Sequence, residues 1–198
     1  MLYGMLHNAG QPEPDTIAFM REAAALRCCH LVQLPCALYE QALVRHFLFD
    51  EAEAVRFELL RTSANTSLAA FARKFAGEIT YHTLHGRAIL KRLCTSTQEA
   101  RTRVEQAFAL LYPYCQGIFE PSPYEDALIA SNIYVGEAAA QAKWHARIAP
   151  FVAELGLAMP PFDGTTGMGG RHGNHTTELA VVLAEMSEVF RLDPTAQW

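Results

Sequence analysis

The sequence predicts an all-α protein, folded as an antiparallel bundle of five to six helices. Apolar residues recur at helical spacing along most of the chain, while alternating strand patterns and Asn-Gly or Asp-Gly hairpin turns are scarce. Hydrophobic residues make up 51% and charged residues 19% of the 198 residues, which suits one domain with a substantial core. We therefore expect a single helical domain over residues 1–198.

Three helices are expected in the first half of the chain, and proline and capping residues mark their ends. Asp15 caps the first helix, which follows Pro14 and continues until Pro35 stops it. The third helix begins at one of two capping residues, Asn65 or Ser67. The expected helices cover residues 15–34, 37–61 and 65–94.

The second half is expected to hold three more helices, which prolines disturb. Pro113 disturbs the fourth helix, and the fifth kinks or restarts at Pro150. Asn174 or His175 lies near the cap of the last helix. Residues 119–132 contain two prolines and are expected to be irregular. The expected helices cover residues 97–118, 135–150 and 174–191.

A glycine-rich segment, LAMPPFDGTTGMGGRHG, occupies residues 157–173 and is the clearest expected loop. Its glycines resemble those of a phosphate-binding loop. No Gly-Lys-Ser or Gly-Lys-Thr follows them, so the pattern favours a flexible connection over a nucleotide site.

Charge and composition exclude several functions. A net charge of −5 argues against nucleic-acid binding, because neutralising phosphates requires a basic surface. No run of about 18 apolar residues is present, so no membrane span is expected. The amino terminus lacks the features of a signal peptide, and five cysteines without a Cys-x-x-Cys motif indicate reduced thiols in a cytoplasmic protein.

Two of the expected long helices carry ionisable residues only at the middle of an otherwise apolar stripe. A solvated face would be polar along its whole length, and a core face would be apolar along it. The two stripes are therefore expected to face each other across a polar pocket inside the bundle. They consist of Leu43, His46, Asp50, Glu53, Phe57 and Leu60 on the second helix, and Phe71, Phe75, Glu78, His82, His85, Ile89 and Leu93 on the third.

Charged groups inside a bundle must pair, take up protons or bind a cation. Helical bundles that hold two iron or manganese ions use inward carboxylates together with Glu-x-x-His pairs. Here the spacing is Glu-x-x-x-His, which favours a hydrogen-bonded polar cluster. A metal site is one alternative, and stripes that simply face solvent or a partner are the other. The candidate metal ligands are Asp50, Glu53, Glu78, His82 and Glu178.

An ordered set of segments resembles the C-type subunits of the bacterial ring-1,2-phenylacetyl-CoA epoxidases, which are multicomponent oxygenases of aerobic phenylacetate degradation. The resemblance runs over nearly the whole chain and ends at the carboxy-terminal Trp198. The segments that carry it are DTIAFMREAAALRCCHLVQLP, ALVRHFLFDEAEA, LAAFARKFAGEITYH, LLYPYCQGIFE and GNHTTELAVVLAEM.

This resemblance implies a ferritin-like helical bundle and a complex with a homologous A-type subunit that carries the di-iron site and binds the CoA ester. Because the family usually has another long helix before the position of Met1, it also implies that residues 1–12 are the remnant of that helix. The C-type subunit is implied to be structural, with no catalytic residue and no cofactor of its own. Glu78, Tyr81 and His82 match the family pattern. Asp50 and Glu53 stand where the family tends to have Asp-x-x-His.

Three functional hypotheses follow. In the leading one, the chain is a non-catalytic subunit of a di-iron monooxygenase that acts on phenylacetyl-CoA, with the A-type subunit as its partner. In the second, the chain is a metal-binding oxidoreductase that holds iron or manganese itself. In the third, it is a divergent paralogue that associates with a second copy of itself. Metal analysis separates the second hypothesis from the first, and light scattering separates the third.

Overall fold

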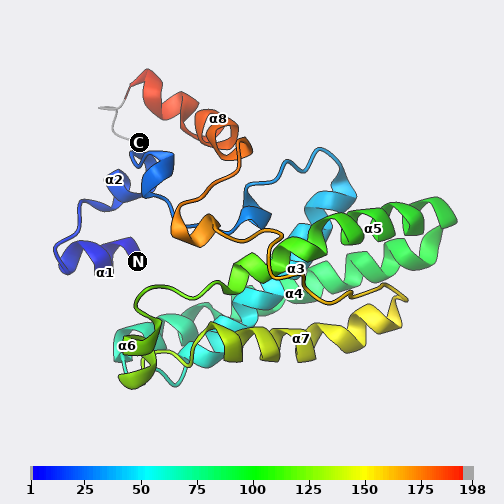
Figure 1. Cartoon of the computed structure of the whole chain (residues 1–198), viewed down its shortest axis with the longest axis horizontal. Helices are drawn as coiled ribbons and strands as arrows, with labels where there is room; N and C mark the ends of the chain where they lie inside the picture. The colour runs from blue at the N-terminus through cyan, green and yellow to red at the C-terminus, as the bar shows by residue number, and fades with distance from the viewer. Residues whose placement is uncertain (1, 194–198) are drawn as a thin grey trace.

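The computed structural model describes residues 2–193 and confirms the all-α class. This range contains eight α-helices, four short 3-10 helices and no β-strand (Figure 1). More helices are present than expected, because three short ones of six or seven residues supplement the long ones. The short helices are α1 (Leu2–Asn8), α2 (Pro14–Phe19) and α6 (Glu125–Ala130).

Four long helices lie side by side and form the bundle (Figure 1): α3 (Tyr39–Leu60), α4 (Thr66–Ser96), α5 (Gln98–Leu111) and α7 (Glu137–Glu154). The expected capping residue Asn65 begins α4, where its side chain accepts hydrogen bonds from two backbone N–H groups. Thr97 ends α4 and caps α5 in the same way, through one backbone N–H. Short capped turns of this kind make neighbouring helices antiparallel.

Aromatic side chains from α5, α7 and the 3-10 helix η3 (Tyr112–Phe119) form the centre of the core. The Tyr112 ring stacks on Phe108 at 5.3 Å and lies 6.2 Å from Trp144. Trp144 is fully buried, and its indole N–H donates a hydrogen bond to the Leu48 carbonyl at 3.1 Å. Each fully buried side chain of this size stabilises the fold by about 1.5–3 kcal/mol.

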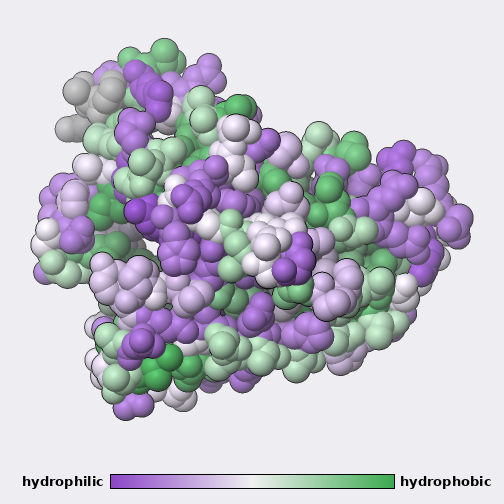
Figure 2. Space-filling view, viewed as in Figure 1, coloured by the Kyte–Doolittle hydropathy of each residue, from purple (hydrophilic) through white to green (hydrophobic). Residues whose placement is uncertain are grey.

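The first and last segments of the described chain lie together at one end of the molecule (Figure 1). This end holds α1, α2, α8 (Glu178–Leu192), and the 3-10 helices η1 (Ala23–Ala25) and η2 (His30–Val32). Phe19 of α2 stacks on Phe190 of α8 with ring centroids 5.8 Å apart. Figure 2 shows hydrophobic side chains on the surface of this end, where Val181, Met186, Val189 and Leu192 of α8 are exposed.

The first expected helix is wrong, since α2 ends at Phe19 and only 3-10 turns follow it. The cause is tertiary. Gln33, which is fully buried, donates a side-chain hydrogen bond to the Cys28 carbonyl and to His175 Nδ1, both at 3.0 Å. Thr176 in turn donates its N–H to Gln33 Oε1. These contacts with the carboxy-terminal segment hold residues 26–33 in an irregular conformation that includes η2, and this conformation is incompatible with a continuous α-helix.

Several other boundaries also differ from expectation. The fourth expected helix ends as α5 at Leu111, and the chain continues as η3, which has Pro113 in its first turn. α7 continues through Pro150, because Ile148 and Phe151 on either side are buried and hold the helix against the core. Residues 125–130 form α6 within the segment expected to be irregular. α8 begins at Glu178, later than expected, because residues 174–177 form the contacts with residues 26–33.

The glycine-rich segment contains only the 3-10 helix η4 (Gly170–His172) and is fastened to the bundle. The Gln116 side chain donates to Asp163 Oδ1 at 2.8 Å and to the Thr166 carbonyl at 2.6 Å. A Cβ on Gly117 would lie 2.0 Å from the Gly167 carbonyl oxygen, so these two glycines permit close backbone contact. The expected flexible connection is therefore a docked loop.

Candidate functional site

The two polar stripes predicted from the sequence meet, and their apolar ends pack as expected. Phe57 of α3 and Phe71 of α4 lie 5.6 Å apart between ring centroids. Further along, the middles of the stripes border a groove of about 470 Å³ between α3 and α4. Its lining residues are Tyr39, Ala42, Leu43, His46, Asp50, Tyr81, His82, His85 and Gly86.

The groove is open to solvent, which corrects the expectation of an enclosed polar pocket. Glu78, His82 and His85 are all exposed, and Asp50 is half-buried. The Tyr81 ring stacks near His85, with centroids 6.1 Å apart. The expected pairing of Glu78 with His82 does not occur, since none of the hydrogen bonds or ion pairs among residues 2–193 joins them. These residues therefore form a surface and not an enclosed cluster.

The other candidate ligands lie elsewhere. Glu53 is half-buried and pairs with Arg56 on its own helix, with 3.0 Å between Oε1 and Nη1. Glu178 lies in the first turn of α8, where hydrogen bonds from its own backbone N–H and from Thr176 lower its pKa. Within residues 2–193, no three histidine, cysteine, aspartate or glutamate side chains are arranged to hold a metal ion. The five candidate ligands do not converge on one point.

Asp50 is the one groove carboxylate, and its pKa is shifted. Partial burial raises the pKa of Asp50, while His46 and His82 act in the opposite direction. A carboxyl whose pKa is higher in the folded state stabilises the fold at low pH and loses this contribution as the pH rises through that pKa.

Replacing Asp50 with asparagine is therefore expected to change the free energy of unfolding by different amounts at pH 7 and pH 4. The change should favour the folded state more at pH 7, where the half-buried carboxyl of the unmodified chain is charged. Urea unfolding at both pH values measures this, and equal effects at the two pH values would contradict it.

A buried charged cluster that the sequence stripes did not include joins three bundle helices. Glu51 of α3 is fully buried. Its two carboxylate oxygens accept hydrogen bonds from Nε of Arg87 on α4 and Nε of Arg147 on α7, each at 2.5 Å. The Arg87 guanidinium also lies over the Phe151 ring, 4.9 Å from its centroid. This arrangement neutralises the buried carboxylate and ties α3, α4 and α7 together.

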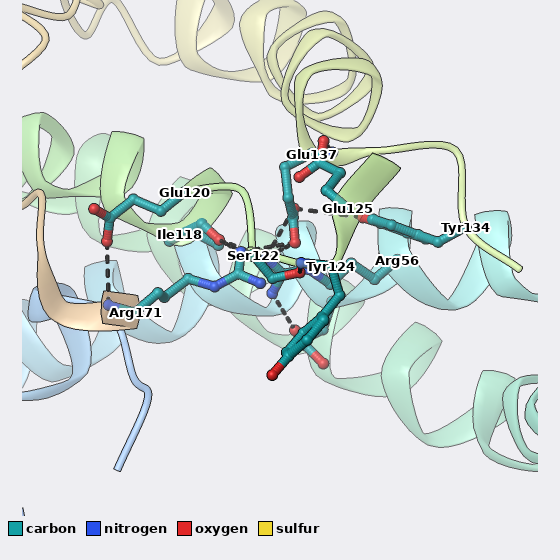
Figure 3. Close-up of polar contacts among 10 residues, drawn as sticks. Arg56, Ile118, Glu120, Ser122, Tyr124, Glu125, Tyr134, Glu137 and Arg171 are labelled. Atoms are coloured by element: carbon teal, nitrogen blue, oxygen red, sulfur yellow. Dashed lines mark hydrogen bonds and ion pairs between the residues drawn. The ribbon is translucent and has the colours of Figure 1, made fainter. Parts of the chain in front are cut away.

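A second charged cluster joins α3, α7 and the docked loop (Figure 3). Glu137, at the start of α7, is 7% exposed and bridges two arginines. Its Oε2 lies 3.2 Å from Arg56 Nη2, and its Oε1 lies 2.7 Å from Arg171 Nη1. Both guanidinium groups also donate to the Ile118 carbonyl. Glu120 accepts the backbone N–H of Arg171 at 3.1 Å, which fixes the loop beside the cluster.

The second cluster raises the pKa of Arg56 and of the neighbouring Tyr134, so that Arg56 keeps its positive charge and Tyr134 keeps its proton. Burial alone lowers the pKa of Arg56, but the carboxylates of Glu137 and Glu53 outweigh it and raise the pKa above its usual value. Burial, together with the nearby Glu137 charge, raises the pKa of Tyr134 to about 12. Arg56 is therefore a permanent cation and Tyr134 a neutral phenol at neutral pH.

The cysteines are five free thiols without an activating environment. Burial raises the pKa of Cys115 well above its usual value, and burial also raises the pKa of Cys28, Cys29, Cys36 and Cys94. A nucleophilic cysteine requires the opposite shift, because the thiolate is the reactive form. These thiols are packing groups.

A sequence signal for the first cluster existed on another face of α3. Val44, Phe47, Leu48, Ala52 and Val55 form the buried stripe at helical spacing, and Glu51 interrupts it. A lone carboxylate on an apolar stripe indicates a buried ion pair. No comparable local signal identifies the arginine partners, which come from distant parts of the chain.

Two comparisons with known proteins agree with the resemblance found in the sequence. A family model described as phenylacetic acid catabolic protein matches residues 1–198. The chain is also 29% identical to the C-type subunit of the 1,2-phenylacetyl-CoA epoxidase of Escherichia coli (strain K12) over 190 residues, or 96% of this chain and 76% of that relative. None of the helices within residues 2–193 is long and apolar enough to cross a membrane. Because the family model matches the full length, the chain belongs to the phenylacetic acid catabolic protein family.

Proposed function

We propose that the chain is a non-catalytic, structural subunit of a cytoplasmic multicomponent oxygenase of phenylacetate breakdown. In this proposal a homologous A-type subunit carries the di-iron site and acts on phenylacetyl-CoA, while this chain pairs with it. Membership of the family and the similarity to a C-type epoxidase subunit support the assignment. The free thiols of this chain support the cytoplasmic location.

The observation that carries the proposal is the way the buried carboxylates are neutralised. Glu51 is paired with Arg87 and Arg147, and Glu137 with Arg56 and Arg171. A bundle that holds two metal ions uses its inward carboxylates as ligands, and the cations balance their charge. Here arginines already supply that charge balance, and each carboxylate oxygen of Glu51 is occupied by a guanidinium donor.

The proposal predicts where metal is found. Purified alone in air, and again after incubation with Fe²⁺ or Mn²⁺, the chain should hold less than about 0.2 metal ions per chain, set against the two ions of a di-metal bundle. Copurified with the A-type subunit, it should form a stable complex that contains iron. Elemental analysis and size-exclusion chromatography measure both results.

A matched pair of variants separates this outcome from a shared metal site. Asp50→Ala and His82→Ala remove two candidate ligands from the α3–α4 groove. Under the proposal, both variants leave the amount of iron per bound A-type subunit unchanged. A lower amount of iron per A-type subunit in either variant complex, or stoichiometric metal on the isolated chain, would show that this chain binds metal itself.

A further inference from the structure

The outer face of α4 is an exposed helix surface with hydrophobic residues at its centre. Tyr81 is 67% and Leu84 is 63% exposed, and these are the large apolar side chains in the middle of the helix. Gly77 and Ala88 lie on the same face one or two turns away and are also exposed. A Cβ on Gly77 would meet no atom within 4 Å, so another backbone has room to approach closely at this position.

Basic residues lie at both ends of this face. α4 contains five cationic residues, Arg73, Lys74, Arg87, Lys91 and Arg92, against the single carboxylate Glu78, in a chain whose net charge is −5. Arg87 is used by the buried Glu51 cluster, and the other four are exposed. Lys91 also forms an ion pair with Glu154 of α7 at 2.5 Å, and both side chains of this pair are about half exposed. They form two pairs, at positions 73–74 and 91–92, which are about 27 Å apart along the helix axis at 1.5 Å per residue.

The α3–α4 groove runs beside this face and widens the available surface. Tyr81 belongs to both, since it is exposed on α4 and lines the groove together with Tyr39 and His46 of α3. A helix laid along α4 would therefore bury aromatic surface from two elements. Burial of an amphipathic helix in such a groove is a common mode of recognition between helical proteins.

We propose that the outer face of α4, together with the α3–α4 groove, docks an acidic amphipathic helix of the catalytic A-type subunit. This inference rests on the proposed function and adds the docking surface and its chemistry. The partner helix places apolar residues against Tyr81 and Leu84 and carboxylates against the two basic pairs. Its acidic residues are consequently spaced about 18 positions apart, the separation of the basic pairs.

A second copy of this chain is a poor occupant of the same face. An antiparallel two-fold pairing centred between Tyr81 and Leu84 places Lys74 of one copy beside Lys91 of the other, and Arg73 beside Arg92. A parallel pairing also brings like charges together. Both arrangements set four cations of one helix against four cations of the other, which is unfavourable.

The test uses the full chain and the homologous A-type subunit from the same organism. Leu84→Glu removes exposed apolar surface and places a negative charge against the acidic partner helix. A double variant, Lys74→Glu with Arg92→Glu, reverses the charge of one residue in each basic pair. Val189→Glu on α8 is the matched control, because Val189 is 61% exposed and Leu84 is 63% exposed. Circular dichroism and thermal unfolding verify that each variant folds as the unmodified chain does.

Both α4 variants are expected to bind the A-type subunit at least about tenfold more weakly, as for a central interface residue, while Val189→Glu binds normally. Binding of the unmodified chain is expected to weaken as the salt concentration rises. If the unmodified chain binds and the α4 variants bind equally well, the docking surface is wrong and the proposed function stands. If the unmodified chain does not bind the A-type subunit at all, both are wrong. A dimer of the isolated chain in light scattering that Leu84→Glu abolishes would also overturn the inference.

Discussion

Replacing both Arg87 and Arg147 with methionine is expected to destabilise the chain by about 3–5 kcal/mol, because the fully buried Glu51 then has no cationic partner. The methionines preserve much of the side-chain volume, so the loss reports the uncompensated charge and not a cavity. Equilibrium unfolding in urea at neutral pH measures the change in the free energy of unfolding.

Two further variants identify the cause of that loss. Adding Glu51→Leu to the double variant removes the unpaired charge and should restore most of the stability, as replacement of buried ion pairs by apolar residues does elsewhere. Lys91→Met removes an ion pair with Glu154 in which both partners are about half exposed, and it should cost no more than about 1 kcal/mol. A triple variant as unstable as the double variant would show that arginine packing, and not charge balance, holds α3, α4 and α7 together.

Replacing Glu137 with alanine is expected to destabilise the chain by about 3 kcal/mol and to release the docked loop. The variant leaves Arg56 and Arg171 in a largely buried position without their shared carboxylate. Arg171 belongs to the loop, so loss of its anchor exposes the peptide bond after it. Trypsin should therefore cleave at Arg171 about tenfold faster in the variant, since cleavage follows the population of the open form.

Glu53→Gln is the control for the second cluster. It removes the carboxylate of Glu53, which contacts Arg56, but leaves both contacts between Glu137 and the arginines in place. Its loss of stability should be smaller, and the rate of cleavage at Arg171 should not change. Mass spectrometry of timed tryptic digests identifies the site. Equal cleavage rates in Glu137→Ala and the unmodified chain would show that the loop is held by Gln116 and Glu120 alone.

Local signals in the sequence predicted the long helices well. Asn65 and Thr97 have short polar side chains that cap the following helix, and no distant residue is needed for this role. The boundaries of α4 follow from such residues, and those of α3 follow from its continuous helical periodicity after Pro35. The facing of the α3 and α4 stripes was also predictable, as the contact of Phe57 with Phe71 confirms. Antiparallel neighbours joined by a short turn align their stripes.

Features that depend on distant contacts were not predictable in this way. Residues 20–34 have helical periodicity, yet the buried Gln33 binds His175 and Thr176, and the chain follows these partners. Pro150 is an ordinary helix breaker by its local chemistry, but flanking core residues keep α7 continuous. In each case the free energy of tertiary packing exceeds the intrinsic preference of the residues for or against a helix. Even the strongest helix breakers, glycine and proline, disfavour a helix by only about 1 and 3 kcal/mol relative to alanine.

The sequence by itself determined the all-α class, the long helices of the bundle, the facing of the polar stripes of α3 and α4, and the family to which the chain belongs. Each depends on spacing or order within the chain. Only the tertiary structure decided which carboxylates are buried and what neutralises them. Glu78 and His82 lie at the surface, while Glu51 and Glu137 are buried between arginine pairs. The stability of a buried charge depends on partners from other helices, and the pattern along one helix does not contain them.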